Sequence, residues 1–202
     1  MDRVITIGRE FGSGGREVGI KLAEKLGIPF YDKELITLAS EAGGIDADII
    51  ARNEEGAHRV TDSGLGRTQY FSFSYKPTFS DAIYFQQCTV IKELAMKGPC
   101  VIVGRCADFV LKDLGSINIF IAASMPYKSE RKRKVAVEKK NFTDQQMEKY
   151  IKGINTARSE YYNHYTGGKW GVSSNYHLCV HSDLVGIDGS VETILTYLNN
   201  IK

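Results

Sequence analysis

The chain has 202 residues, of which 43% are hydrophobic and 25% are charged, and its formal net charge is +2 at pH 7. This length allows one domain with a substantial buried core, and the composition is that of an ordinary globular protein. Because so small a net charge gives no indication of a polyanionic partner, we expect no nucleic-acid binding.

The sequence contains no run of about 18 apolar residues, and Asp2 and Arg3 precede a strand pattern rather than a signal-peptide core. We therefore expect no membrane association and a cytoplasmic location. The four cysteines and four histidines show no zinc-ligand spacing. Cys100 and Cys179 lie in apolar runs, which predicts buried free thiols in a reducing compartment.

Short apolar runs alternate with segments of helical period along the chain. Because most of these runs are apolar on both faces, they predict a parallel sheet with helices on each side and the first strand at its centre. The segment 58–79 has no sustained period, which is typical of a lid or a binding insert. The predicted strands are 4–7, 28–31, 100–103, 117–122 and 176–181, and the predicted helices are 17–26, 33–42, 46–55, 80–97, 107–112, 126–139, 143–164 and 190–198.

A glycine-rich stretch, GREFGSGGREVG, runs from Gly8 to Gly19 between the first strand and the first helix. In a parallel sheet, ligands gather at the carboxyl ends of the strands, where this stretch lies. Backbone N–H groups of such a turn and the helix N-terminus together favour a phosphate group. The alternative is a tight turn without a ligand. We expect an anion at the backbone of residues 12–16.

Two longer patterns carry a resemblance to a known family. The stretch GSGGREVGIKLAEKLGIPFYD resembles the start of the nucleoside monophosphate kinases. The chain as a whole resembles the cytidylate kinase-like family, through its Gly-Gly-Arg-Glu loop, its Phe-Tyr-Asp-Lys-Glu run and its Tyr-Tyr…Lys-Trp-Gly stretch.

The resemblance implies one P-loop NTPase domain over residues 1–202, an α/β fold of three layers with a five-stranded parallel sheet. It also implies a small acceptor-binding insert at about 43–79 and a helical lid at about 125–165. The implied activity is transfer of the γ-phosphoryl group of ATP, with Mg²⁺, to a small phosphorylated or hydroxyl acceptor such as a pyrimidine monophosphate. Nothing in the sequence indicates an oligomeric state.

The loop departs from that of the true kinases. Gly15 stands where the resemblance places a phosphate-binding lysine, and Glu17 stands where it places a magnesium-binding Thr or Ser. Arg16 is the nearest cation in the loop, and we expect it to supply the missing charge, the alternative being a solvated arginine. Glu17 is compatible with a magnesium contact or with a favourable charge at the helix N-terminus. These losses keep a second reading open, a nucleotide-binding sensor without turnover.

The nucleotide phosphates are assigned to the loop, and the resemblance assigns the acceptor to two residues beyond it. Asp32 ends the second strand and is either an acceptor-orienting carboxylate or the N-cap of the next helix. Arg105 follows the third strand and is either an acceptor-phosphate ligand or a surface arginine. No residue is assigned as a metal ligand. The phosphate-binding set is Arg9, Gly12, Ser13, Gly14, Gly15, Arg16 and Glu17.

The basic stretch SERKRKVAVEKK most often marks a solvated helix face, but the resemblance makes it a lid that closes over the phosphoryl group. Arg131 and Arg133 lie on different faces of that helix, so only one points inward, and we favour Arg131. Arg158 is a third lid candidate, and the predicted catalytic set is Arg16, Asp32, Arg131 and Arg133. An aromatic cluster precedes the last strand, where packing against the lid helices ranks above stacking on a base; it comprises Tyr161, Tyr162, Tyr165, Lys169 and Trp170.

Overall fold

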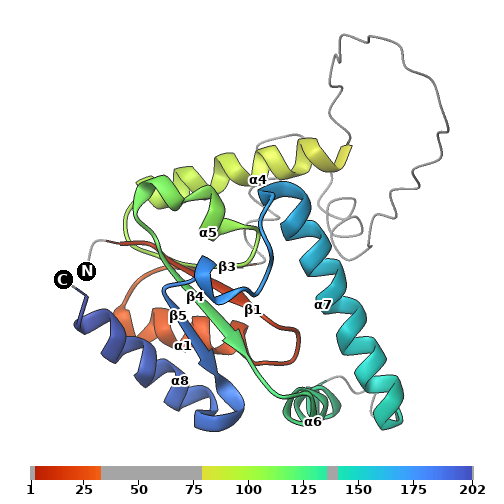
Figure 1. Ribbon diagram of the computed structural model, residues 1–202. Coiled ribbons are helices and arrows are strands. Elements are labelled where there is room, and N and C mark those ends of the chain that lie inside the picture. Colours follow the sequence, from red (N-terminus) through yellow and green to blue (C-terminus); the bar gives the residue numbers. More distant parts are fainter. Residues whose placement is uncertain (1–2, 33–78, 136–140, 202) are drawn as a thin grey trace, which may run out of the picture.

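The computed structural model describes residues 3–32, 79–135 and 141–201 of the chain (Figure 1). The helices predicted at 33–42 and 46–55 and the insert predicted at about 43–79 lie outside these residues. The same holds for most of the last turn of the helix predicted at 126–139.

Within the described residues, the strands form one five-stranded parallel sheet in the order β2-β3-β1-β4-β5. The first strand of the chain is central, with Ile5 in register with Val101 on one side and Ile117 on the other. The predicted sheet and the central position of its first strand are therefore confirmed. The strands are β1 (Ile5–Arg9), β2 (Phe30–Tyr31), β3 (Val101–Val103), β4 (Ile117–Ala122) and β5 (Leu178–His181).

Helices cover both faces of the sheet, as Figure 1 shows. On one face, α1 (Gly15–Leu26) and α8 (Ser182–Asn199) bury residues such as Leu22 and Ile194 against the strands. On the other, α4 (Phe79–Met96) and α5 (Ala107–Val110) pack Ile91 against Ile102. Beside the sheet, α7 (Asp144–Thr166) runs from α4 to α6 (Met125–Val135). Short 3-10 turns occupy Lys112–Leu114 and Ser173–Asn175.

Local signals explain where two of these helices start and stop. Gly27 ends α1 in the left-handed conformation, where its N–H bonds back to the carbonyls of the last turn. Thr143 starts α7 with a capping box. The Thr143 hydroxyl accepts a hydrogen bond from the N–H of Gln146, and the Gln146 side chain accepts one from the N–H of Thr143. Both boundaries lie close to those predicted.

Two sequence-based expectations are wrong. The last helix begins at Ser182, eight residues before the predicted start at 190, and crosses a non-helical break at Gly186. The glycines at 186 and 189 made this segment resemble a loop. Cys179 is exposed, because β5 is an edge strand and alternate side chains point away from the core, whereas Cys100 is buried as predicted.

The burial of α1 on the sheet gives a stability prediction. Leu22 is fully buried, so Leu22→Ala should lower the free energy of unfolding by about 2–5 kcal/mol through lost transfer energy and a residual cavity. Leu184→Ala, at a side chain that is 80% exposed on α8, is the control and should change it by less than about 0.5 kcal/mol. Urea unfolding measures both, and equal effects would contradict this packing.

Candidate functional site

The glycine-rich loop joins the central strand β1 to the N-terminus of α1. Gly12 and Gly14 have positive φ angles of 88° and 82°, which favour glycine. Gly12 also lies against α6, since a Cβ atom there would be 2.9 Å from the Cβ atom of Lys128. By position, the N–H groups of Gly15, Arg16 and Glu17 have no acceptor within the helix, and the first intrahelical bond runs from Val18 to the Gly14 carbonyl. The loop therefore has the backbone geometry of an anion site.

Ser13 does not contribute its side chain to that site. Its side chain is fully buried, and both its hydroxyl and its N–H donate to the carbonyl of Glu10, at 2.9 and 3.3 Å. Its own carbonyl accepts from the Ser182 hydroxyl at 2.6 Å. The hydroxyl of Ser13 is thus used inside the loop, and the phosphate contact of this residue stays a prediction.

Glu10 and Lys128 form an ion pair that sequence reasoning missed. The Lys128 ammonium donates to Oε2 of Glu10 at 2.8 Å, and the N–H of Ala123 donates to the same oxygen at 3.0 Å. The Lys128 side chain is only 6% exposed. One carboxylate therefore joins the loop, the end of β4 and α6. No local signal separates Lys128 from the other basic residues of its helix.

The long helix α7 also contacts the loop. The Asn155 side chain accepts from the N–H of Phe11 at 2.7 Å, and Arg158 donates to the carbonyl of Arg9 at 3.1 Å. The guanidinium of Arg158 lies 5.4 Å from the centre of the Phe11 ring. Arg158, a lid candidate from the sequence, is thus at the loop.

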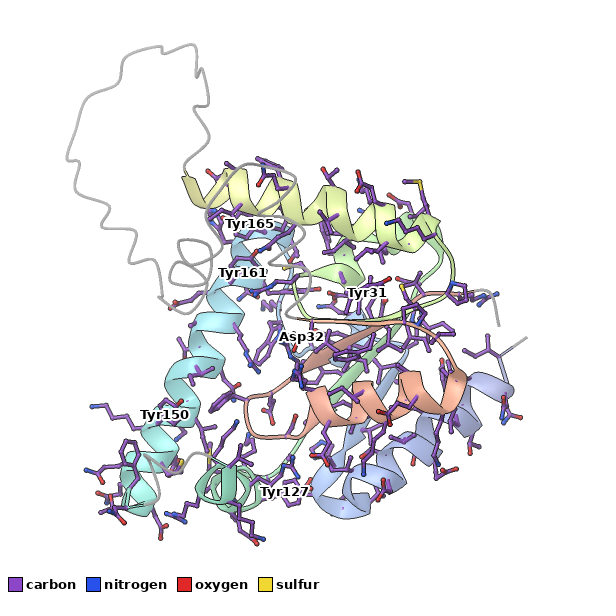
Figure 2. The ribbon with its side chains drawn as sticks, turned by 180° about the vertical axis from the view of Figure 1, so that it is seen from behind. Tyr31, Asp32, Tyr127, Tyr150, Tyr161 and Tyr165 are labelled. Carbon is purple, nitrogen blue, oxygen red and sulfur yellow. The ribbon has the colours of Figure 1, made fainter. Side chains whose placement is uncertain are left out.

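Asp32, labelled in Figure 2, follows β2, and two arginines pair with its carboxylate. Arg16 donates to Oδ2 of this carboxylate at 2.7 Å, and Arg9 lies 3.7 Å from Oδ1. Burial lowers the pKa of Arg9 to about 10, which Asp32 opposes and the positive charges of Arg105 and Arg16 reinforce. Burial likewise lowers the pKa of Arg158 to about 9, and Arg9 and Arg105 add to that effect. The cluster therefore carries more positive charge than Asp32 alone balances.

Arg105 enters this cluster through an unusual turn after β3. Gly104, Arg105 and Cys106 have successive positive φ angles of 82°, 58° and 54°. Left-handed backbone at non-glycine residues costs free energy and often occurs at functional sites. The turn is held by a bond from the Gly104 N–H to the Ile7 carbonyl, at 3.1 Å. Arg105 is thereby placed near enough to Arg9 and Arg158 to affect their charges.

The basic helix α6 presents two of its cations to the loop. Arg131 pairs with Glu17 at 2.8 Å and lies near Gly14. Lys132, which the sequence did not single out, stands 4.0 Å from the centre of the Phe11 ring. Arg133 points elsewhere, to Asp144 and the carbonyl of Phe142. The structure thus brings Arg131 to the loop and leaves Arg133, predicted as catalytic, outside it.

The aromatic cluster packs inside the protein. Tyr165, labelled in Figure 2, stacks on Tyr84 of α4 with ring centres 3.9 Å apart. Tyr162 donates to Asp108 of α5 at 2.7 Å. Trp170 meets Phe120 of β4 edge-on. These rings pack between α7, one of the predicted lid helices, and α4, α5 and β4. Lys169 is exposed.

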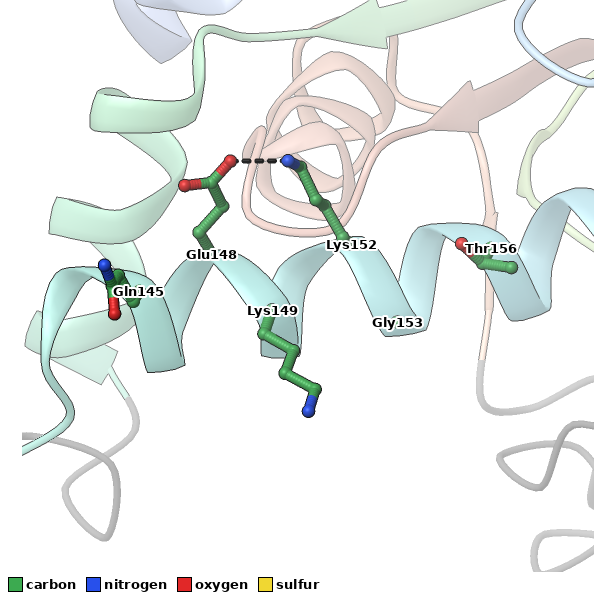
Figure 3. Close-up of a pocket in the computed structure, with 6 residues that line it drawn as sticks. All are labelled: Gln145, Glu148, Lys149, Lys152, Gly153 and Thr156. Carbon is green, nitrogen blue, oxygen red and sulfur yellow. Dashed lines mark ion pairs between the residues drawn. The ribbon is translucent and has the colours of Figure 1, made fainter.

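A hollow on the surface of α7 is separate from this site. All its lining residues come from one helix, and its ion pair joins Lys152 to Glu148 at 2.6 Å (Figure 3). None of them belongs to the glycine-rich loop or to the arginine cluster. The lining residues are Gln145, Glu148, Lys149, Lys152, Gly153 and Thr156.

In residues 3–32, 79–135 and 141–201, no group of three or more His, Cys, Asp or Glu side chains could hold a metal ion. Asp32 and Glu17 are the carboxylates paired with arginines at the loop. Of the helices described, none is both long and apolar enough to cross a membrane.

A glycine-rich loop that follows the central strand of a parallel sheet and opens a helix is the arrangement found in the P-loop class of α/β proteins, although other nucleotide-binding folds share it. The family model described as "Cytidylate kinase-like family" matches residues 4–184. The chain therefore belongs to the cytidylate kinase-like family, and the resemblance seen in its sequence is confirmed.

Solved structures agree on the fold. An uncharacterized protein from Eubacterium ventriosum ATCC 27560 is 29% identical, with coverage of 98% of this chain and 99% of that chain and a TM-score of 0.69. A shikimate kinase from Bacteroides thetaiotaomicron is 13% identical over 98% and 99% of the two chains, with a TM-score of 0.60.

A shikimate kinase from Acinetobacter baumannii in complex with shikimate is 15% identical over 100% and 96%, with a TM-score of 0.56. At such low identity, the likeness to the shikimate kinases shows the fold alone. No curated protein matches the sequence.

The Glu10–Lys128 pair gives a second stability prediction. Lys128→Met should lower the free energy of unfolding by about 1–3 kcal/mol, because the Glu10 carboxylate loses its cation in a mostly buried position. Lys134→Met is the matched control on the same helix, since its pair with Glu130 is exposed and worth about 0.3–0.5 kcal/mol. Urea denaturation compares the two. If Lys128→Met were as mild as the control, the pair would not hold the loop.

Asp108 gives a pH prediction. Burial raises the pKa of this carboxyl, although the hydrogen bond from Tyr162 opposes the shift. The native state therefore binds the proton more tightly, and the associated stability is present below the unfolded pKa of about 3.9 and lost as pH rises through the raised folded value. Between these two pKa values, the free energy of unfolding of the parent should fall with rising pH relative to that of Asp108→Asn. Urea unfolding from about pH 4 to pH 7 measures both proteins, and the same dependence of the free energy of unfolding on pH in parent and variant would refute this prediction.

Proposed function

We propose that this protein is an ATP-dependent phosphotransferase of the nucleoside monophosphate kinase type, which transfers the γ-phosphoryl group to a small acceptor. The observation that carries the proposal is the gathering of arginines from separate elements at one glycine-rich loop. Phosphoryl transfer is catalysed mainly by positioning and by neutralising charge on the phosphoryl oxygens. Membership of a kinase-like family supports the same reaction class. The arginines are Arg9, Arg16, Arg105, Arg131 and Arg158.

The proposed roles follow the placement of the side chains. The backbone of the loop and Arg9 hold the nucleotide phosphates, while Arg131 and Arg158 approach from the two lid helices and neutralise the transferring group. Arg105 binds an acidic group of the acceptor. Asp32, held in place by Arg16 at 2.7 Å, orients the acceptor or accepts its proton.

Magnesium fits this arrangement in number of ligands. The ion is usually held by one or two carboxylates together with the substrate phosphates, and Asp32 and Glu17 are two carboxylates beside the loop. When bound with ATP, magnesium would neutralise phosphate charge. Each carboxylate is paired with an arginine. The nucleotide phosphates would have to bind those arginines in place of the carboxylates before the carboxylates could bind the ion.

The acceptor is proposed to be a small phosphorylated or hydroxyl compound, with cytidine monophosphate the first candidate. We also propose that residues 1–202 form a single domain with the acceptor insert at about 43–79 and the lid at about 125–165. A cytoplasmic location stays a prediction.

A nucleotide-binding sensor without turnover is the second candidate. Gly15 and Glu17 replace the lysine and the hydroxyl residue of the kinase loop, and the Glu17 carboxylate is engaged by Arg131. Such a protein would bind ATP or ADP and transfer nothing.

Calorimetry followed by a transfer assay tests both candidates. The parent should bind ATP with Mg²⁺ and phosphorylate at least one acceptor among nucleoside monophosphates and small hydroxyl compounds. Arg158→Met should weaken ATP binding by roughly one to two orders of magnitude, because a charge-assisted contact is lost. Lys134→Met, exposed on the lid helix, should leave it unchanged. Binding without transfer to any acceptor would favour the sensor, and no binding of ATP or ADP would overturn both.

A further inference from the structure

The side chain of Arg9 occupies the space above Gly15, the position where the kinase loop carries its lysine. A Cβ atom at Gly15 would lie 2.5 Å from the Cβ atom of Arg9 and 3.1 Å from its Cγ atom. Real Cβ atoms essentially never approach so closely, and the Cβ atom of Arg9 is fixed by strand β1. With Arg9 in this position, residue 15 is restricted to glycine.

The other end of Arg9 lies over a second glycine. A Cβ atom at Gly104 would overlap the Nη1 atom of Arg9 and lie 2.8 Å from its Cζ atom. Beyond Gly104, the guanidinium reaches to 3.7 Å from Asp32. Arg9 therefore passes from the start of α1 to the end of β3, between the loop and the proposed acceptor residues Asp32 and Arg105.

Arg16 takes a different course. Its Nε atom is bonded to Asp32 at 2.7 Å, its guanidinium stands 5.6 Å from the centre of the Phe30 ring, and its side chain is 48% exposed. The Arg9 side chain is 22% exposed. Since a partly desolvated cation interacts more strongly with a phosphate than an exposed one, Arg9 is the better placed of the two.

We infer that Arg9 replaces the missing loop lysine as the cation that binds the nucleotide phosphates, and that Gly15 is glycine because a side chain there would overlap Arg9 close to the backbone. The inference rests on the proposed function for its ligand, a nucleoside triphosphate. It assigns to a strand residue the role that the sequence alone predicted for Arg16. The positive charge enters the site from the sheet instead of from the helix.

Calorimetric titration with ATP and with inorganic pyrophosphate tests the cation. Arg9→Ala should weaken binding of both ligands by roughly 10- to 100-fold, and Arg9→Lys should restore most of the loss. Arg16→Ala should weaken binding less than Arg9→Ala does, and Lys134→Ala is the control for loss of a nearby exposed charge. The proposal is overturned if Arg9→Ala binds like the parent, or if Arg16→Ala loses more affinity.

A ligand-free stability cycle tests the steric part by itself. Gly15→Ala should lower the Tm by about 3–8 °C in the parent, because the new methyl group overlaps Arg9 near the backbone. In an Arg9→Gly background, which removes that atom, the same substitution should lower the Tm by less than half as much. Equal losses in the two backgrounds overturn the steric claim.

An exchange of the two residues links both tests. Gly15→Lys alone should be destabilising, whereas Gly15→Lys combined with Arg9→Gly should bind pyrophosphate at least about 10-fold more tightly than Arg9→Gly alone. If the double variant binds pyrophosphate no more tightly than Arg9→Gly does, the claim that Arg9 replaces the loop lysine is overturned. If the parent binds neither ATP nor pyrophosphate, the proposed function and the cation role both fall. The stability cycle still decides why residue 15 is glycine.

Discussion

The carboxylate of Glu10 is the contact on which the geometry of the site depends. It receives the ammonium of Lys128 and the N–H of Ala123, and its own N–H bonds to the carbonyl of Ile121. One residue of the loop is thus bonded to β4 and to α6 at the same time. Because α6 carries Arg131 and Lys132, this mostly buried pair helps to set the position of those cations. Charge-assisted hydrogen bonds are stronger than neutral ones, so this pair ties the lid helix to the loop.

The cations assembled in this way repel one another. The positive charge of Arg105 lowers the pKa of Arg9 and of Arg158, the charge of Arg9 lowers the pKa of Arg158, and the Asp32 carboxylate opposes both shifts. Burial makes such a group of like charges costly, since the surrounding protein solvates them less well than water does. A bound phosphate chain would supply the missing negative charge. Binding an anion would relieve the unfavourable free energy that desolvation and mutual repulsion give these arginines. That relief would add to the affinity for the anion, as in a preorganised site.

The sequence predicted the parts of the fold that depend on local pattern. Apolar runs such as 117–122 stood out as strands, and the ends of α1 and α7 followed from Gly27 and Thr143. The carboxyl ends of parallel strands lie at the same edge of a sheet, and this rule also placed Asp32, at the end of the second strand, near the loop. Contacts between distant segments could not be predicted in this way, since Lys128 is one basic residue among many until α6 packs on Gly12. The helix period separated the faces of Arg131 and Arg133, but their partners Glu17 and Asp144 did not follow from it. The position of the loop relative to the lid helix is set by tertiary packing, which no local sequence pattern indicates.

The site also shows why a motif can lose its best-known residue without losing its charge. A lysine at position 15 would start from the first turn of α1, whereas Arg9 starts from the last residue of the central strand. The two side chains would compete for the same volume, as the approach of Arg9 to Gly15 shows, so the protein can hold one or the other. A guanidinium supported by the sheet presents a planar pair of donors in a fixed direction, while an ammonium on a flexible stem is a point charge that adapts. A loop built around Arg9 therefore gains directional contacts to phosphate oxygens and gives up the freedom of a lysine to follow the phosphoryl group. This difference concerns the geometry of binding more than its strength, and it makes the close approach of Arg9 to Gly15 the defining feature of this loop.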